Sequence, residues 1–248
     1  MSELISVLCP TRKRPHNMQT LVSSAMETAN SVKNLEFVFY IDNDDDLSQK
    51  KIEEFYQEQT AAVASGKDFP KIKHVVGDRI VLSEMWNKCL EASSGNIFMH
   101  CGDDIIFRSQ DWDKLVIEAF DQYEDKVVLV YGNDGHHNEG LSTHGFVHRK
   151  WVDIIGYLCP PYFSSDWNDR WLFDVAIELK RTKWLPDVFT EHMHPDSGKA
   201  ELDETHRDRI ERGKRDGVAQ LYNAIEMQIK RTEDVQKLHQ EIKRCKTG

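Results

Sequence analysis

The feature that most constrains the fold of this 248-residue chain is the alternation, through its first half, of short apolar runs with longer amphipathic stretches. The apolar runs have the length of buried strands, and the stretches between them repeat their apolar residues at helical spacing. Strands that alternate with helices predict an α/β fold with a mostly parallel sheet and helices on both faces. The strands are expected at residues 4–9, 35–41, 72–76, 97–101 and 127–131, and the helices at 17–29, 47–64, 82–92 and 112–123.

The second half of the chain is less regular. The elements expected there are a loop over 132–142, a helix at 167–179 and a strand near 184–188. The tail is helical in composition and carries an apolar stripe at helical spacing, formed by Leu221, Ile225, Ile229, Val235, Leu238 and Ile242. That stripe either packs back on the preceding domain or pairs with a second copy in a homodimer. We therefore expect an α/β domain over 1–200 and a C-terminal helical extension over 201–248.

Composition narrows the class of protein further. Hydrophobic residues make up 40% of the chain, which is enough for a packed core and argues against disorder. The formal net charge of −10 argues against a broad surface for nucleic acid, which needs clustered Lys and Arg. Five scattered cysteines without a CxxC pair are typical of free thiols in a reducing compartment. With no basic leader and no apolar run long enough to span a membrane, we expect a cytoplasmic protein.

Two adjacent carboxylates, Asp103 and Asp104, follow the strand expected at 97–101 after a break at Gly102. Ligands of such sheets bind at the edge formed by the carboxyl ends of the strands. Carboxylate oxygens suit Mg²⁺ or Mn²⁺, which usually take one or two protein carboxylates together with substrate phosphates. Taken alone, such a pair is more often a polar turn after a core strand. Residues at the other strand ends are therefore needed to distinguish a metal site from a polar turn.

A basic loop follows the first expected strand. It runs from Pro10 to Pro15 and contains Thr11, Arg12 and Arg14. Cationic side chains at the entry of a helix can hold the phosphates or the base of a nucleotide. A solvated basic turn has the same appearance, and the sequence does not separate the two.

Polar residues also follow the second and third expected strands. The acidic run that includes Asp42 and Asp44 can accept hydrogen bonds from a base or from ribose hydroxyls, and it can equally cap the next helix at Asp46. Arg79 is placed to contact a diphosphate. Asn87 lies within a helix, where Asn is mildly disfavoured, so we expect it to make a specific hydrogen bond.

Two later groups of titratable residues are candidates for chemistry. Asp166, Asp169 and Asp174 lie around the start of a helix, and any one of them suits a general base that removes the proton of a reacting hydroxyl. For Asp169 the helix dipole alone is a sufficient explanation. His192 and His194 are two residues apart, so on a strand their side chains face the same side and can ligate a metal.

Taken together, these motifs resemble the GT-A-fold glycosyltransferases, in particular the family-2-like inverting enzymes that use nucleotide-diphosphate sugars. The likeness extends over roughly residues 5–195 and implies a GT-A, Rossmann-like fold for the domain over 1–200. The matching segments are 10–12, 40–45, 79–87 and 101–103, which resemble the family's opening loop, base-recognition loop, approach to the metal strand and Asp-x-Asp motif.

The resemblance implies a metal site for Mn²⁺ or Mg²⁺. Cys101 stands where the first aspartate of the Asp-x-Asp motif is usual, so metal binding transfers first to Asp103 and then to the following Asp104. His192, with His194 close behind, resembles the metal-ligating histidine that lies late in these enzymes.

The resemblance also implies the catalytic, donor and acceptor residues. Asp169 resembles the catalytic base, which removes the acceptor proton. Donor binding is expected from Pro10, Thr11, Arg12, Arg14, Asp42, Asp44, Arg79, Asn87 and Asp103, and acceptor binding from Asp134, His144, Gly145 and Asp166.

The expected activity is therefore metal-dependent transfer of a sugar from a nucleotide-diphosphate sugar to an acceptor hydroxyl, with inversion. The acceptor stays open among a saccharide, a lipid carrier, a protein and a modified nucleobase. One alternative is a nucleotidyltransferase, which would need a Gly-rich phosphate loop that residues 10–15 lack. The other is a non-catalytic nucleotide-sugar-binding protein on the same scaffold, which the cysteine at position 101 favours.

Overall fold

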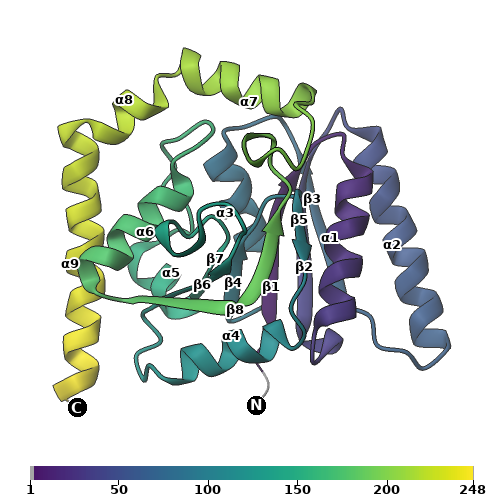
Figure 1. The fold of residues 1–248 in the computed structure, drawn as a ribbon, viewed down its shortest axis with the longest axis horizontal. Coiled ribbons are helices and arrows are strands. Elements are labelled where there is room, and N and C mark those ends of the chain that lie inside the picture. The colour runs from purple at the N-terminus through teal and green to yellow at the C-terminus, as the bar shows by residue number, and fades with distance from the viewer. Residues whose placement is uncertain (1–2, 248) are drawn as a thin grey trace.

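The computed structural model describes residues 3–247, so residues 1, 2 and 248, which the expected domain ranges include, lie outside the description. The strands are β1 Ile5–Thr11, β2 Leu35–Asp42, β3 Lys71–Gly77, β4 Ile97–His100, β5 Ile105–Phe107, β6 Leu129–Asn133, β7 Gly145–His148 and β8 Thr182–His192. The helices are α1 Pro15–Thr28, α2 Asp46–Ala64, α3 Leu82–Ala92, α4 Trp112–Asp121, α5 Arg149–Ile155, α6 Asn168–Leu179, α7 Glu204–Arg215, α8 Val218–Asn223 and α9 Ile225–Thr247. Figure 1 shows the strands as one central sheet, with α7 and α8 forming an arch above one of its edges.

The sheet has the strand order β3-β2-β1-β4-β7-β6-β8-β5. Strands β3, β2, β1 and β4 are parallel neighbours, as the alternation of strands and helices predicts. The expectation of a mostly parallel sheet is wrong for the whole sheet, because β7 is antiparallel to both β4 and β6, and β5 is antiparallel to β8, although β6 and β8 are parallel. The sheet is therefore mixed. The chain reverses between β6 and β7 through a loop instead of crossing over through a helix, so these strands pair as antiparallel neighbours.

Both faces of the sheet are buried, and each has its own apolar core. Along β1, Val7 and Cys9 pack toward α1 and α4, whereas Leu8 packs toward α3 on the opposite face. The same alternation holds in β2, where Phe39 and Tyr40 lie in different cores. Helices that cover both faces explain why the central strands are apolar at nearly every position.

The first two helices begin at residues other than those expected. Pro15 occupies the first turn of α1 and Arg14 is its N-cap, so Asn17 lies inside the helix. In α2 the cap is Asp45, whose side chain accepts a hydrogen bond from the backbone N–H of Ser48, while Asp46 is the first helical residue. Both caps direct the preceding loop toward the carboxyl edge of the sheet.

The C-terminal helix packs back on the domain. On α9, Met227, Val235, Leu238 and Ile242 are buried in the core that α5 and α6 also line, whereas Ile225 and Ile229 are exposed. Its Asp234 accepts hydrogen bonds from the Tyr157 hydroxyl and, at 3.1 Å, from Trp171 Nε1. The apolar stripe is thus largely satisfied within one copy of the chain. No helix of the described residues has the length and apolar character needed to span a bilayer.

Candidate active site

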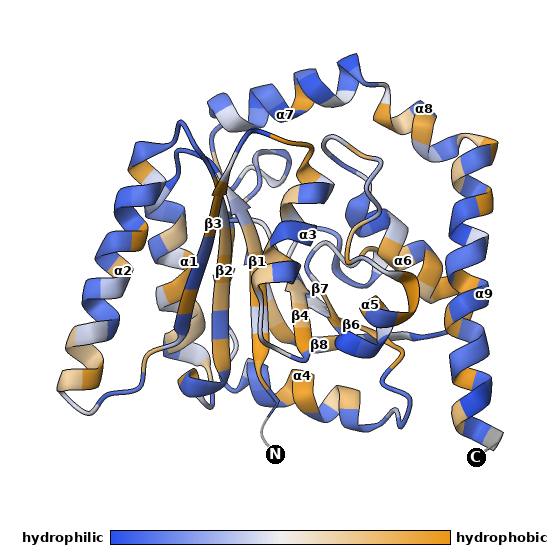
Figure 2. Cartoon of the chain, turned by 180° about the vertical axis from the view of Figure 1, so that it is seen from behind, coloured by the Kyte–Doolittle hydropathy of each residue, from blue (hydrophilic) through white to orange (hydrophobic). Residues whose placement is uncertain are grey.

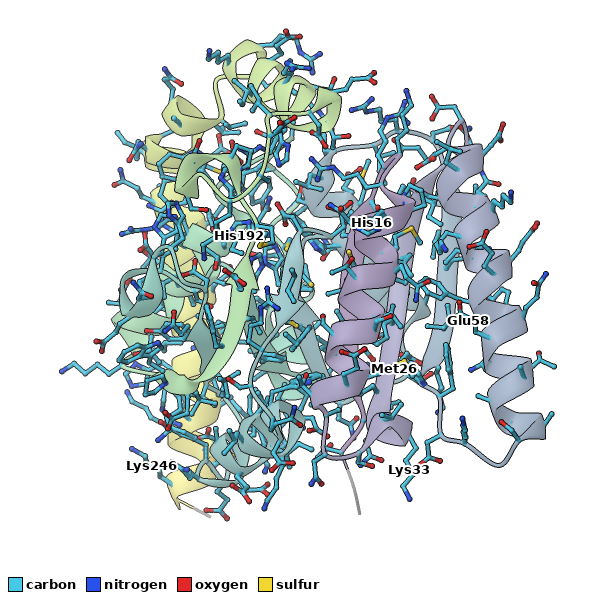
Figure 3. All side chains as sticks on the ribbon, turned by 45° about the vertical axis from the view of Figure 1, so that its right-hand side comes forward. His16, Met26, Lys33, Glu58, His192 and Lys246 are labelled. Carbon is cyan, nitrogen blue, oxygen red and sulfur yellow. The ribbon has the colours of Figure 1, made fainter. Side chains whose placement is uncertain are left out.

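A cavity lies at the carboxyl edge of β1, β2 and β4, and residues of α7 form part of its wall. Figure 1 shows α7 above the sheet. Its lining includes thirteen of the residues proposed from the sequence: Pro10, Thr11, Arg12, Arg14, Asp42, Arg79, Asp103, Asp104, His144, Asp166, Asp169, His192 and His194. Figure 3 places His192 at the end of β8, at the same edge as His16 in the first turn of α1. Segments far apart in the chain therefore meet where the sequence predicted a ligand site.

Arg12 joins the loop after β1 to the loop after β2. Its guanidinium donates to Asp42 at 2.7 Å and to Asp44 at 2.8 Å. The hydrogen bond from Arg12 lowers the pKa of Asp44 to about 2. Burial raises the pKa of Asp42, and its Oδ1 atom is buried without a hydrogen-bond partner among the described residues. A buried oxygen of this kind is available to accept from a ligand, and leaving it unpaired is costly.

Asp103 is held by two residues of the loop after β1. Its Oδ2 accepts from the Thr11 hydroxyl at 2.8 Å, and its Oδ1 accepts from Arg14 Nη1 at 2.8 Å. Burial raises the pKa of Asp103, which Arg14 opposes. Cys101 lies fully buried in the apolar core, so the first position of the expected Asp-x-Asp motif faces away from any ligand.

Asp104 faces two imidazoles. His192 Nε2 lies 3.4 Å from Asp104 Oδ2, and His206 Nε2 lies 3.9 Å from the same oxygen. Burial alone would raise the pKa of Asp104, but its interactions with His192 and His206 hold the pKa well below its usual range. A carboxylate and two imidazole rings placed together offer donors suited to a divalent cation.

The other histidines of the cavity differ in their surroundings. The ring of His144 lies 4.6 Å from that of His192, centroid to centroid, and both His144 nitrogens are buried without partners among the described residues. Burial lowers the pKa of His144 well below its usual value and that of His194 to about 4, so both rings are neutral at pH 7. His194 Nδ1 accepts from the backbone N–H of Asp196 at 3.2 Å. Within residues 3–247, no three His, Cys, Asp or Glu side chains are arranged to hold a metal among themselves.

Asp169 lies in the first turn of α6, in the cavity wall. The N-cap before it, Trp167, has a left-handed backbone with φ of 80°, a strained conformation for a large side chain. Burial raises the pKa of Asp169 to about 6, and the charge of Asp166 adds to this increase. Asp174, the third carboxylate of the group, lies outside the cavity and bonds to Arg170 and Tyr222. Of the three candidates, Asp169 has the pKa and the position that suit a general base.

Four of the proposed residues lie outside the cavity lining. Asp44 is exposed on the far side of Arg12, and Gly145 belongs to β7. Asn87 binds the backbone of Leu158 and Cys159. Their roles as ligand contacts stay predictions that the geometry does not support.

The fourth of these residues, Asp134, organises its own loop. Its Oδ1 accepts three backbone N–H groups, from His136, His137 and Asn138, and its Oδ2 accepts from the Thr143 hydroxyl. These bonds lower the pKa of Asp134 against the effect of burial. Its expected acceptor contact is therefore also without support, although its loop leads to Thr143 and His144 in the cavity wall.

Helix α7 contributes residues to the cavity that were not predicted from the sequence. Thr205, His206, Arg209 and Arg212 line the cavity, although they lie beyond residues 5–195, over which the resemblance extends. A signal for this helix was present: Asp203 is an N-cap whose side chain accepts from the N–H of His206, and the two arginines are three residues apart on one face. No local pattern indicated that this face returns to the strand ends.

Solved structures with the same fold include a mannosyltransferase from Pyrobaculum calidifontis in complex with GDP-Man and Mn²⁺, with a TM-score of 0.63 and 14% identity over 80% of this chain and 59% of that chain. They also include S. aureus TarS 1–349, with a TM-score of 0.56 and 16% identity over 96% of this chain and 81% of that chain, and the same protein in complex with UDP, with a TM-score of 0.55 and 16% identity over 75% and 59%. The fold is thus that of the GT-A glycosyltransferases.

The family itself follows from the sequence match. The family model of glycosyl transferase family 2 matches residues 6–157, more than half of the chain. The chain belongs to glycosyltransferase family 2. A search of curated proteins found no match. The matched segment ends before Asp169, His192 and α7, so the family model covers the β1 to α5 part of the cavity only.

Proposed function

We propose that this chain transfers a sugar from a nucleotide-diphosphate sugar to an acceptor hydroxyl, with inversion at the anomeric carbon. The proposal rests on the presence of Asp169, a carboxylate with a pKa of about 6, in the same cavity as Asp103 and Asp104. Family membership supports it, as do the GDP-Man, UDP and UDP-GlcNAc complexes of proteins with this fold.

On the donor side, the unpartnered Oδ1 of Asp42 accepts a hydrogen bond from the base or the ribose. Arg12 holds this carboxylate in place through the other oxygen, Oδ2. Burial raises the pKa of Asp42, and the pairing opposes this increase, since an adjacent guanidinium favours the charged form. The nucleoside would therefore lie over the ends of β1 and β2, with its diphosphate directed toward Asp103 and Asp104.

The cavity also fits a divalent cation of the Mn²⁺ or Mg²⁺ class. Asp104 and His192 would hold it, because both Asp103 oxygens are already bonded and His194 caps a short turn. Two protein ligands match the habit of these ions, which complete their shell with water and substrate phosphates. The cation would supply positive charge for the diphosphate leaving group. Asp104, rather than Asp103, is therefore proposed as the main carboxylate ligand of the metal.

The reaction is a single displacement. The acceptor oxygen attacks the anomeric carbon from the face opposite the diphosphate, and the glycosidic C–O bond to the diphosphate breaks with its electron pair leaving on phosphate oxygen. Asp169 takes the proton of the acceptor hydroxyl as the new bond forms. Its pKa of about 6 leaves it mostly ionised at pH 7 yet basic enough to share a proton, which is the balance that a general base requires.

Replacement of the base tests the assignment. Asp169→Asn should lower kcat by about 10²–10⁴-fold with little change in the KM for the donor. In the wild type, activity should rise with pH through about 6 and then level off, because the base works only when ionised; the variant should lose this limb. Asp174→Asn is the matched control, since that carboxylate lies on the same helix outside the cavity. Wild-type rates in Asp169→Asn, with an unchanged pH profile, would refute the role of Asp169.

The products separate the proposed reaction from its alternatives. A panel of nucleotide sugars and acceptors should release nucleoside diphosphate and form a product whose anomeric configuration, read by NMR, is the opposite of the donor's. Release of pyrophosphate in place of nucleoside diphosphate would identify a nucleotidyltransferase. Donor binding without turnover on any acceptor, and without metal-dependent hydrolysis, would identify a binding protein.

A further inference from the structure

Ion pairs and hydrogen bonds of charged side chains hold helix α7 against the residues around the cavity. It carries five basic and three acidic residues among its twelve, and only His206 and Gly213 of the helix are buried. Figure 2 shows α7 mostly in the colour of hydrophilic residues, unlike the strands beneath it. A helix without an apolar face gains little from burial, so its position depends on the specific bonds that it makes.

Those bonds reach three loops of the cavity. Asp203, the N-cap of α7, accepts two hydrogen bonds from Arg14, each of 2.7 Å. Asp208 pairs with Arg79, which follows β3, and Arg209 Nη1 lies 3.2 Å from Asp166 Oδ1. Every arginine that lines the cavity is therefore paired with a carboxylate in this structure.

The partners of these arginines fall into two kinds. Arg12 and Arg14 are bound by Asp42 and Asp103, buried carboxylates at the carboxyl edge of the sheet, and Arg14 is bound by Asp203 as well. Arg79 and Arg212 share one carboxylate, Asp208, whose Oδ2 lies 3.0 Å from Arg212 Nη2. Asp208 is part of the polar helix and is partly exposed, so an incoming anion can replace it.

The place of this pair suits the phosphates of a donor. Arg79 Nε lies 3.9 Å from Oδ2 of Asp42, the carboxylate proposed to bind the nucleoside. Arg79 and Arg212 each direct one guanidinium nitrogen at Oδ2 of Asp208. Two guanidinium groups that converge on one oxygen also suit the oxygens of a phosphate, which Arg recognises by charge-assisted hydrogen bonds. A diphosphate that enters a cavity lined by five aspartates also needs cationic partners not already committed to fixed carboxylates.

We propose that Arg79 and Arg212 bind the diphosphate of the nucleotide donor, and that Asp208 occupies their guanidinium groups until the donor replaces it. This inference rests on the proposed function and extends the donor site to α7, outside the segment matched by the family model. Asp208 competes with the donor for the two arginines, so it weakens donor binding, whereas Arg212 strengthens it.

The two roles predict opposite effects on ligand affinity when each residue is replaced. Calorimetric titration of the full chain with UDP, GDP and inorganic pyrophosphate, with magnesium present throughout, measures these affinities. Arg212→Gln should weaken nucleoside diphosphate and pyrophosphate binding by about 10-fold or more, the usual scale for a lost charge-assisted hydrogen bond. Asp208→Asn should strengthen binding a few-fold, because the competing charge is gone and the side-chain shape is kept. Arg207→Gln, an exposed charge on the same helix and outside the cavity, is the control and should leave the affinity unchanged.

An unchanged affinity in Arg212→Gln would overturn the proposal, and so would an Asp208→Asn variant that binds more weakly than the wild type, since Asp208 would then be a support of the helix. The donor reaction is judged separately. Pyrophosphate binding that depends on Arg212, in a protein that transfers no sugar, would keep the anion site and refute the proposed function. If the protein transfers sugar but Arg212→Gln and Asp208→Asn bind with wild-type affinity, the proposed function stands and the proposed anion site is refuted.

Discussion

Among the helices that border the cavity, α3 and α7 are held in different ways. α3 buries Met85, Trp86 and Cys89 in the core beneath β1 and β2. α7 buries only His206 and Gly213, and ion pairs such as Arg14–Asp203 hold it in place. Apolar burial gives a wall that is insensitive to salt and ligand, whereas ion pairs give a wall whose bonds a charged ligand can replace. The cavity wall thus combines α3, which is fixed by apolar packing, with α7, whose ion pairs a charged ligand can replace.

The largest expected effect tests the fixed side. Trp86 is almost fully buried, its ring centroid lies 4.0 Å from that of His100, and its Nε1 donates to the backbone oxygen of Cys101. Trp86→Ala should lower the free energy of unfolding by about 3–5 kcal/mol, through lost burial and the cavity that remains. Chemical denaturation measures this value, with the exposed Glu84→Gln on the same helix as control. A loss below about 1 kcal/mol would mean that α3 is not anchored by its core residues.

A smaller effect is expected at Gly213, where α7 lies close to Ser165. A Cβ atom at Gly213 would lie 2.6 Å from Ser165 Oγ, so Gly213→Ala should push α7 outward although alanine favours the helix itself by about 1 kcal/mol. Amide hydrogen exchange in α7 should become faster while the rest of the protein is unaffected. Ser165→Ala removes the clashing oxygen, which is buried without a partner among the described residues, and should restore slow exchange in the double variant. If the single Gly213→Ala variant exchanges like the wild type, the close approach does not hold α7.

The smallest effect compares the two helices directly. Raising the ionic strength from 0.1 M to 1 M shortens the Debye length from about 10 Å to about 3 Å, and partly exposed ion pairs contribute about 0–1 kcal/mol each. Hydrogen exchange in α7 should therefore accelerate a few-fold at high salt, whereas exchange in α3 should change little. An equal response of both helices would remove the distinction between an apolar and a charged wall.

The parallel half of the sheet was predictable from the sequence because each of its strands is buried on both faces. Residues 35–41 are apolar except for the buried Glu36, and such a nearly continuous apolar run is typical of strands covered by helices on two sides. β5 and β7 have three and four residues and follow loops rich in polar residues, so no periodicity marks them. α5, with seven residues, was missed for the same reason.

The candidate site was predictable only in part. Arg12, Asp42 and Asp103 follow parallel strands, and the ends of such strands meet at one edge whatever the details of packing. Asn87 and Asp134 have the composition of ligand contacts, yet their polar atoms bind nearby backbone groups. Residue type alone does not show whether a polar side chain binds a ligand or a backbone group of the protein.

The sequence by itself determined the layered α/β core and the strand ends where charged loops gather, because apolar periodicity records locally which side of each element is buried. Only the tertiary structure decided the antiparallel pairing in the second half and the return of α7 over the cavity. Both depend on contacts between residues far apart in the chain: Arg79 and Asp208 are 129 positions apart and meet only after the domain between them has folded. Ion pairs at such separations leave no periodic pattern in the sequence.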